Sequence, residues 1–110
     1  MNRRTGQLLL LALLVLVAVS LWVGRAHGAT PAMPSMLAWI GRCETGMRWD
    51  WNQRDYVSAF GMYRQTYEQG RQATHTRPWR YPYPTPAEQV KVALWVAGRY
   101  GWTAWGCGRR

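Results

Sequence analysis

Residues 8–23 form an uncharged, strongly apolar run behind two N-terminal arginines, and this run decides where the folded part of the chain can lie. A basic start, an apolar run and a following stretch of small residues are typical of a secretory signal peptide. Ala26 and Gly28 match the −3 and −1 positions of a cleavage site, so we predict cleavage after Gly28. The alternative is an uncleaved membrane anchor, although a spanning helix usually needs about 20 apolar residues. Both interpretations export residues 29–110 to the cell wall or the medium.

The exported part is small and contains two cysteines, Cys43 and Cys107. A domain of this size buries little apolar surface and usually needs a covalent or metal staple. Outside the cytoplasm thiols oxidise, and two cysteines allow one intrachain pairing. That bond would close a loop of about 65 residues and contribute about 4 kcal/mol in the chain-entropy model. The alternative is a pair of free, buried thiols.

The first predicted helix runs from Met36 to Thr45, after a proline-bearing linker over residues 29–34. Its apolar residues recur at helical spacing and fall on one face. Ser35 is placed to cap the start of this helix, and Gly46 is placed to end it. Residues 52–60 mix turn formers with Tyr-Val and predict an irregular loop or a weak hairpin.

The second half of the exported part contains the clearest helix signal. A short second helix is predicted over residues 61–69, and residues 71–84 form a long loop without periodicity. Such a loop is either a binding element or a plain surface excursion. Residues 85–88 (TPAE) form a capping box with Pro at the first helical position, which predicts a third helix ending near Tyr100. We therefore predict one α+β, mainly α domain over residues 35–110.

The chain has 14 basic and 5 acidic residues and a formal charge of +9. A positive surface rich in Trp and Tyr suits nucleic acid, anionic lipid or envelope glycan. Because the domain is exported, we expect a glycan partner and no nucleic acid. His75 is the one histidine beyond the signal segment, and no paired His/Cys spacing exists, so we expect no metal and no cofactor.

Glu44 is the strongest candidate for a catalytic carboxyl group. It follows Cys43 at the end of the first helix, with Trp39, Trp49 and Trp51 close in sequence, so a partly apolar pocket is expected. Such a pocket suits a general acid. Arg48 supports the opposite interpretation, because a helical salt bridge to Glu44 would keep the carboxylate ionised.

The other four acidic residues are weaker candidates for the catalytic carboxyl group. Glu88 belongs to the capping box, and Glu68 lies on a short polar helix where solvation is expected. Asp50 and Asp55 lie in a loop rich in Trp and Arg.

Residues 39–46 (WIGRCETG), followed by Trp49, resemble the opening motif of the resuscitation-promoting factors, which are secreted, lysozyme-like, muralytic proteins. The family pattern is approximately W-x-x-[IV]-A-x-C-E-S-G-x-x-W, with Thr45 here in place of Ser. The family continues with an Asn and G-G-L-Q-F-x-x-x-T-W, and this chain has Asn52, residues 58–62 (SAFGM) and Thr66-Tyr67.

The second half of the family pattern is also present in order. The family reads [ST]-R-E-x-Q-I-x-V-A, then Q-G-W-x-A-W and a cysteine. This chain has residues 85–93 (TPAEQVKVA), residues 100–105 (YGWTAW) and Cys107. The resemblance covers nearly the whole exported part. It departs from the family at Gly61 and Tyr100, which replace glutamines.

The resemblance implies a small lysozyme-like fold with a Cys43–Cys107 bridge. It also implies that Glu44 is the general acid on the glycosidic oxygen of peptidoglycan. By the same alignment the substrate-binding residues are expected to be the following: Trp49, Asn52, Thr66, Tyr100 and Trp102. We expect a monomer that binds peptidoglycan glycan strands.

The expected reaction is cleavage of the β-1,4 bond between N-acetylmuramic acid and N-acetylglucosamine. Ordinary hydrolysis needs a second carboxyl group, for which Asp50 and Asp55 are loose candidates. The alternative is a one-carboxylate route in which the muramyl 6-hydroxyl attacks its own C1 and leaves an anhydro sugar. Two other classes stay open: a non-catalytic glycan-binding module of the same fold, and a cationic protein that binds membranes or nucleic acid.

Overall fold

The structure, a computed structural model, describes residues 30–109; the predicted signal or anchor in residues 1–28 lies outside them. The elements in chain order are the following: α2 (Ser35–Thr45), β1 (Tyr56–Val57), β2 (Met62–Tyr63), α3 (Arg64–Thr74), α4 (Pro86–Tyr100) and the 3-10 turns η1 (Trp102–Ala104) and η2 (Cys107–Arg109). The prediction of a small, mainly helical domain is confirmed. No helix in residues 30–109 has both the length and the apolar character to cross a bilayer.

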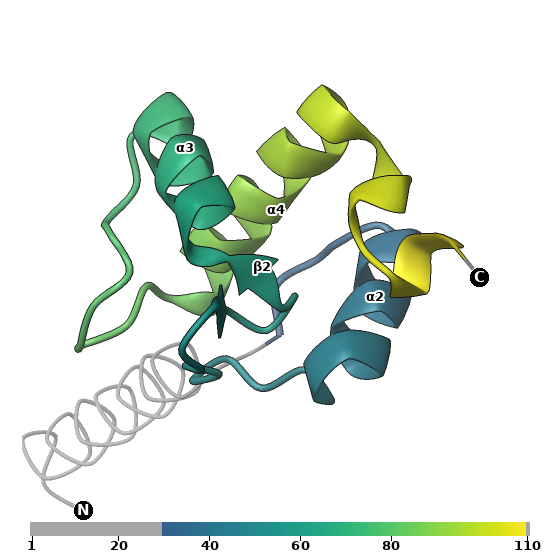
Figure 1. Cartoon of the computed structure of the whole chain (residues 1–110), viewed down its shortest axis with the longest axis horizontal. Coiled ribbons are helices and arrows are strands. Elements are labelled where there is room, and N and C mark those ends of the chain that lie inside the picture. The colour runs from purple at the N-terminus through teal and green to yellow at the C-terminus, as the bar shows by residue number, and fades with distance from the viewer. Residues whose placement is uncertain (1–29, 110) are drawn as a thin grey trace, which may run out of the picture. The chain divides into compact units, whose positions relative to one another are not determined.

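Two packing interactions organise the domain (Figure 1). Helix α3 packs along α4, and the C-terminal turn η2 packs against α2, so the two ends of the domain lie together. Between these pairs, β1 and β2 form a two-stranded antiparallel hairpin, with Tyr56 opposite Tyr63 and Val57 opposite Met62. The predicted weak hairpin therefore exists, but its second strand lies beyond residue 60.

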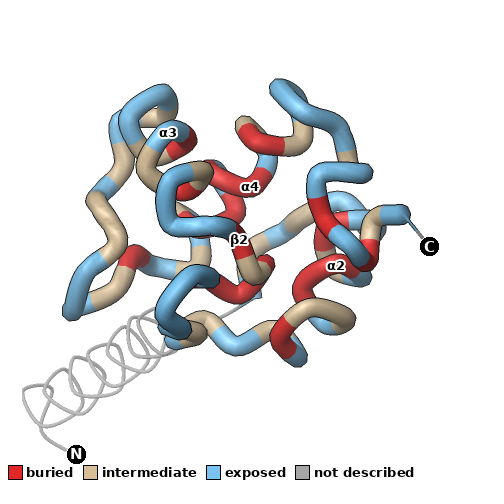
Figure 2. The backbone as a smooth tube through the Cα atoms, viewed as in Figure 1, coloured by how far each residue is buried: buried red, intermediate tan, exposed pale blue. Residues whose placement is uncertain are grey.

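The core lies where α2, the hairpin and α4 meet (Figure 2). Leu37 and Ile40 enter it from α2, Phe60 from the hairpin turn and Tyr67 from α3. One face of α4 adds three valines and Ala93. Each of these side chains is hidden from solvent, as the helical period of the apolar residues requires.

Helix α2 agrees with its prediction except at its first residue. Ser35 lies inside the helix, the N-cap is Pro34, and no side chain caps the exposed amides. The predicted cap at Ser35 is therefore wrong by one position. Gly46 does end the helix, in the left-handed conformation with φ of 72°. The apolar face is narrower than predicted, because Met36 and Trp39 are exposed.

Helix α3 is shifted toward the C-terminus relative to its prediction over residues 61–69. Met62 and Tyr63 pair with β1 and leave the helix, which starts at Arg64 and continues to Thr74. The long loop consequently begins at His75, in a left-handed conformation, and not at Arg71. Strand pairing with the preceding strand β1 has overridden the helical preference of these two residues.

Helix α4 is predicted correctly at both ends. The Thr85 hydroxyl accepts from the Glu88 backbone amide, and the Glu88 carboxylate accepts from the Thr85 amide, which completes the capping box. Glu88 also accepts from Arg77 of the preceding loop, at 2.9 Å. The Arg77 guanidinium is the largest influence that lowers the pKa of Glu88, to about 2.

The Cys43–Cys107 disulfide is present and joins α2 to η2, with the two Cα atoms 6.1 Å apart. No free cysteine remains among residues 30–109. The bond fixes the C-terminal segment beside the last turn of α2. Glu44 follows Cys43 directly, so the staple also fixes the surroundings of that carboxylate.

Candidate active site

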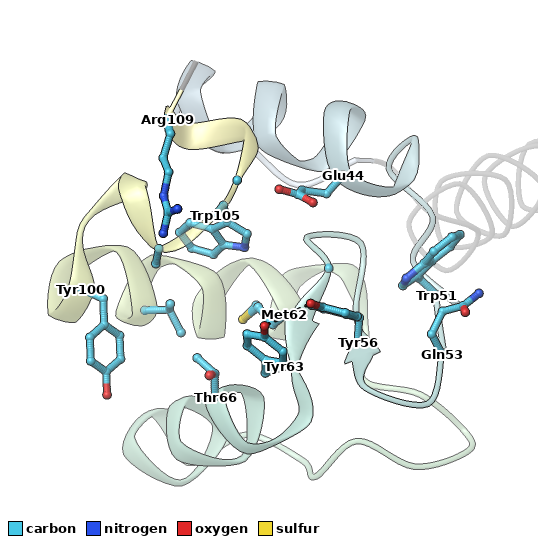
Figure 3. A pocket seen from close by; sticks show the side chains of 14 residues that line it. Glu44, Trp51, Gln53, Tyr56, Met62, Tyr63, Thr66, Tyr100, Trp105 and Arg109 are labelled. Carbon is cyan, nitrogen blue, oxygen red and sulfur yellow. Dashed lines mark hydrogen bonds between the residues drawn. The ribbon is translucent and has the colours of Figure 1, made fainter.

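A cleft of about 730 Å³ opens between α2 and the C-terminal turns on one side and the hairpin with α3 on the other (Figure 3). Its walls are mostly aromatic and polar, and Val96 of α4 contributes to its floor. The full lining is the following: Glu44, Trp51, Gln53, Tyr56, Gly61, Met62, Tyr63, Thr66, Val96, Tyr100, Ala104, Trp105, Gly106 and Arg109. Among residues 30–109, Glu44 is the one carboxylate that lines this cleft.

The Glu44 side chain extends from α2 into the cleft (Figure 3) and is half-buried. Its Oε1 accepts a hydrogen bond from the backbone amide of Cys107 at 3.0 Å. This amide belongs to the segment that the disulfide ties to α2. One carboxylate oxygen is therefore held by fixed backbone, and Oε2 is left for a partner in the cleft.

Two glycines give this carboxylate its space. A Cβ atom on Gly61 would lie 3.3 Å from Glu44 Cβ and 3.8 Å from Oε2. Gly61 also has φ of +61°, which side chains rarely adopt. A Cβ on Gly106 would lie 3.7 Å from Oε1. Glycine at 61, where the resembling family has Gln, lets the hairpin turn approach the acid closely.

The hairpin turn is braced against α2 and α4 through the backbone of Ala59. Its carbonyl accepts from the Thr45 hydroxyl at 2.6 Å, and its amide donates to the buried Gln89 side chain at 2.9 Å. Thr45 follows Glu44 directly, so these two hydrogen bonds fix the position of the hairpin turn next to the Glu44 carboxylate. The hydroxyl that Thr45 shares with the family's Ser is therefore a structural anchor.

The predicted ion pair between Arg48 and Glu44 is absent. The ion pairs within residues 30–109 are Glu68–Arg71 and Glu88–Arg77. Arg48 lies beyond the end of α2 and places its guanidinium over the Trp51 ring, 5.6 Å from the centroid. Glu68, expected to be simply solvated, is paired through Arg71, which lowers its pKa.

Two tyrosines of the hairpin form the wall that faces Glu44 (Figure 3). The Tyr56 and Tyr63 rings stack with centroids 4.7 Å apart, and the Tyr56 hydroxyl donates to that of Tyr63 at 3.1 Å. This hydrogen bond is the largest cause that raises the pKa of Tyr56 above its ordinary value. Both phenols can hydrogen-bond to hydroxyl or amide groups of a ligand in the cleft.

Of the five substrate contacts predicted from the resemblance, two line the cleft. Thr66 enters it from α3, and Tyr100 lies at its end, with its hydroxyl donating to Gln69 at 3.2 Å. The other three lie outside the lining. Trp49 packs its ring against Phe60 in an edge-to-face contact, and Trp102 packs beside the core.

Asn52, the remaining predicted substrate contact, instead forms hydrogen bonds that connect neighbouring loops. Its Oδ1 accepts from Arg64 at 2.6 Å and from the Trp79 indole at 3.2 Å, and its Nδ2 donates to Tyr83. Asn52 thus joins the hairpin, α3 and the loop over residues 75–84. Trp79 stacks on Tyr83 in that loop, with centroids 4.9 Å apart.

Several cleft residues had not been singled out as substrate contacts from the sequence. The largest are the following: Trp51, Trp105, Tyr56, Tyr63 and Arg109. The two tyrosines could have been found from the sequence. Each hairpin strand carries an aromatic residue at its solvent-facing position, and such positions of a two-stranded hairpin remain exposed. Arg109 gave no signal, since it lies in an irregular segment after the last recognisable motif.

The expected second carboxyl group is not brought to the cleft. Asp50 and Asp55 are exposed, and neither belongs to the lining. Residues 30–109 also contain no group of three or more His, Cys, Asp or Glu side chains arranged to hold a metal ion.

Comparison of the chain with protein-family models and with curated proteins returned no match.

Proposed function

We propose that this chain is an exported, lysozyme-like enzyme that cleaves the β-1,4 bond between N-acetylmuramic acid and N-acetylglucosamine in peptidoglycan. The observation that supports this best is the setting of Glu44. A half-buried carboxyl group stands in an open, aromatic-walled cleft, with one oxygen held by the Cys107 amide and no ion-pair partner among residues 30–109. A general acid must lie within hydrogen-bond reach of the oxygen that it protonates, and Oε2 faces the space where a glycan would bind.

In the proposed first step, Glu44 carries its proton on Oε2 and donates it to the glycosidic oxygen. The bond from that oxygen to the muramyl C1 then breaks, and positive charge develops on the muramyl ring. The Cys107 amide keeps Oε1 in place while Oε2 loses its proton. The carboxylate formed lies beside the ring and stabilises its positive charge.

The second step follows from the number of carboxylates. Hydrolysis with two carboxyl groups would need a partner about 5–9.5 Å from Glu44. Neither Asp50 nor Asp55 lines the cleft, so we favour the one-carboxylate route. Glu44 then accepts the proton of the muramyl 6-hydroxyl, whose oxygen bonds to C1 and closes an anhydro ring.

The walls of the cleft suit a glycan strand. The Tyr56 and Tyr63 side chains are exposed and present rings and phenol hydroxyls, which stack on and hydrogen-bond to sugars, while Trp105 lines the same cleft but is almost completely buried. Thr66 adds a hydroxyl from α3. Such walls would hold the glycan across Glu44 so that the glycosidic oxygen meets Oε2.

A non-catalytic glycan-binding module is the second candidate. The single carboxylate favours it, because a binding site needs stacking surfaces and no acid pair. It keeps the same cleft and the same ligand. It differs in predicting that the wall polymer is retained and left intact.

A substitution at Glu44 separates the two candidates. In Glu44→Gln the amide oxygen can still accept from Cys107, so the fold should be preserved while the acid is lost. Glu68→Gln is the matched control, since Glu68 lies outside the cleft lining. The oxidised, exported protein is incubated with purified peptidoglycan, and the soluble products are identified by mass spectrometry.

We expect anhydro-muramyl products from the wild type and from Glu68→Gln, and at least a 100-fold loss in Glu44→Gln. Products with ordinary reducing ends would replace the intramolecular route with hydrolysis. Retention of the polymer without cleavage by all three proteins would support the binding module. Neither cleavage nor retention would overturn both candidates.

A further inference from the structure

The cleft contains two charged side chains, Glu44 and Arg109, among neutral neighbours. They are not joined: no hydrogen bond or ion pair within residues 30–109 links them. Arg109 is therefore not present to neutralise the catalytic carboxylate. The orientation of Arg109 toward the cleft needs another explanation, because a long basic side chain usually extends into solvent when nothing holds it.

Arg109 is held in a defined direction. It lies in η2, just after the disulfide cysteine Cys107, and its Nε donates to the Thr103 carbonyl of η1 at 2.9 Å. Figure 3 shows the side chain pointing from the C-terminal segment into the cleft. With Nε occupied, both Nη atoms are free of protein partners within residues 30–109. A guanidinium presented in this way is prepared for an acceptor from outside the protein.

The chemistry of the guanidinium indicates what that acceptor is. Its planar fork matches the two oxygens of a carboxylate, with bonds roughly twice as strong as those to neutral acceptors. Neutral sugar hydroxyls do not exploit this geometry. Muramyl residues carry carboxylates along the attached stem peptide, or on the lactyl group where that peptide has been removed.

We propose that Arg109 is a specificity-determining residue that binds a carboxylate of the muramyl unit, from the lactyl group or its stem peptide, in the cleft beside Glu44. This inference rests on the proposed function and names the substrate feature that the same cleft selects. It requires a peptidoglycan-type acidic glycan. A neutral polymer of N-acetylglucosamine would lack the contact and would be a poor ligand.

The test combines variants of the protein with variants of the polymer. The full, exported chain is prepared as wild type, Arg109→Gln, Arg109→Lys and Arg42→Gln. Arg42 is the matched control, because it is exposed on α2 two residues before Glu44 and so faces away from the cleft. Both Gln variants lose one positive charge, so any general attraction to an anionic wall falls equally.

Three polymers are compared: intact peptidoglycan, peptidoglycan with its carboxylates converted to amides, and glycan strands freed of stem peptides by an amidase. On intact polymer we expect Arg109→Gln to lower kcat/KM about 10- to 100-fold, Arg109→Lys to lose less, and Arg42→Gln to stay within about 2-fold. On amidated polymer the wild type should fall to the level of Arg109→Gln. On peptide-free strands, where the amidase has freed the lactyl carboxylate, sensitivity that persists shows that this carboxylate also binds Arg109, and loss of sensitivity restricts the contact to the stem peptide.

The inference is overturned if Arg109→Gln equals the wild type on intact polymer, or if its defect is as large on amidated polymer as on intact polymer. The second result would indicate a role in holding η1 and η2 together through Thr103. Cosedimentation of the same variants in a Glu44→Gln background measures binding without cleavage. A chain that binds through Arg109 but cleaves nothing would refute the proposed catalysis and leave this inference standing.

Discussion

Gln89 is the residue whose replacement should destabilise this domain most sharply for the smallest change in shape. Its side chain is completely buried on α4. Oε1 accepts from the Ala59 amide at 2.9 Å, and Nε2 donates to the carbonyls of Trp49 and Pro84 at 2.8 and 2.9 Å. One amide group thus satisfies backbone atoms of three different loops.

Gln89→Leu keeps the volume of the side chain and removes all three hydrogen bonds. A buried backbone group left unpaired costs about 1–3 kcal/mol, with carbonyls at the lower end. Three such groups give roughly 3–6 kcal/mol, and the added apolar burial of Leu offsets about 1–2 kcal/mol. We therefore expect the free energy of unfolding to fall by about 3 kcal/mol, a large part of the stability of a small domain.

Urea denaturation of the oxidised protein measures this loss. Gln65→Leu is the matched control, because Gln65 is exposed on α3 and should change stability by less than about 0.5 kcal/mol. A loss below about 1 kcal/mol in Gln89→Leu, with an unchanged m-value, would refute the reasoning. The three backbone groups would then have other partners, and the brace at Ala59 would not depend on Gln89.

Three further predictions concern pH, burial and redox state. The pKa of Glu88 falls from 4.5 to about 2 on folding, so its contribution is complete above about pH 4.5 and is lost as the pH falls toward 2. Solvent screening of the half-exposed Arg77 limits that contribution to roughly 1–2 kcal/mol, and Glu88→Gln should remove the dependence from acid denaturation curves. The Tyr67 hydroxyl is buried without a partner among residues 30–109. Tyr67→Phe should therefore leave the free energy of unfolding unchanged or raise it by about 1 kcal/mol. A loss above about 1 kcal/mol in thermal unfolding would contradict this. Reduction of the Cys43–Cys107 disulfide should lower the free energy of unfolding by about 4 kcal/mol. It should also abolish wall cleavage, because it releases the Cys107 amide from Glu44. Full activity in reductant would show that the disulfide is not needed to position Glu44.

The features that the sequence predicted well depend on neighbouring residues. Two such features are the capping box at Thr85 and Glu88 and the left-handed helix end at Gly46. Both are formed by hydrogen bonds within a few residues, so they can be recognised from the sequence alone. The disulfide could also be predicted without the fold, because two cysteines in a chain expected to be exported have one pairing to make. Glu44 was singled out by its place beside one of those cysteines.

The features that it missed depend on how segments pair and pack with one another. The start of α3 moved because Met62 and Tyr63 gain strand partners at Tyr56 and Val57. The sequence also could not sort its many aromatic residues between core and cleft. Trp105 is buried in the core and also lines the cleft, whereas Trp49 and Trp102 are partly buried against the core and lie outside the cleft lining, although all three share the same chemistry.

The amino-acid sequence by itself determined the helices with local stop signals, the covalent staple and the identity of the candidate acid. Only the tertiary structure decided which side chains surround that acid. The surroundings are built from α2, the hairpin, α3 and the C-terminal turns, which meet only after the core has formed. The direction of Arg109 is set by one carbonyl in a neighbouring turn, and no pattern along the chain encodes such a contact.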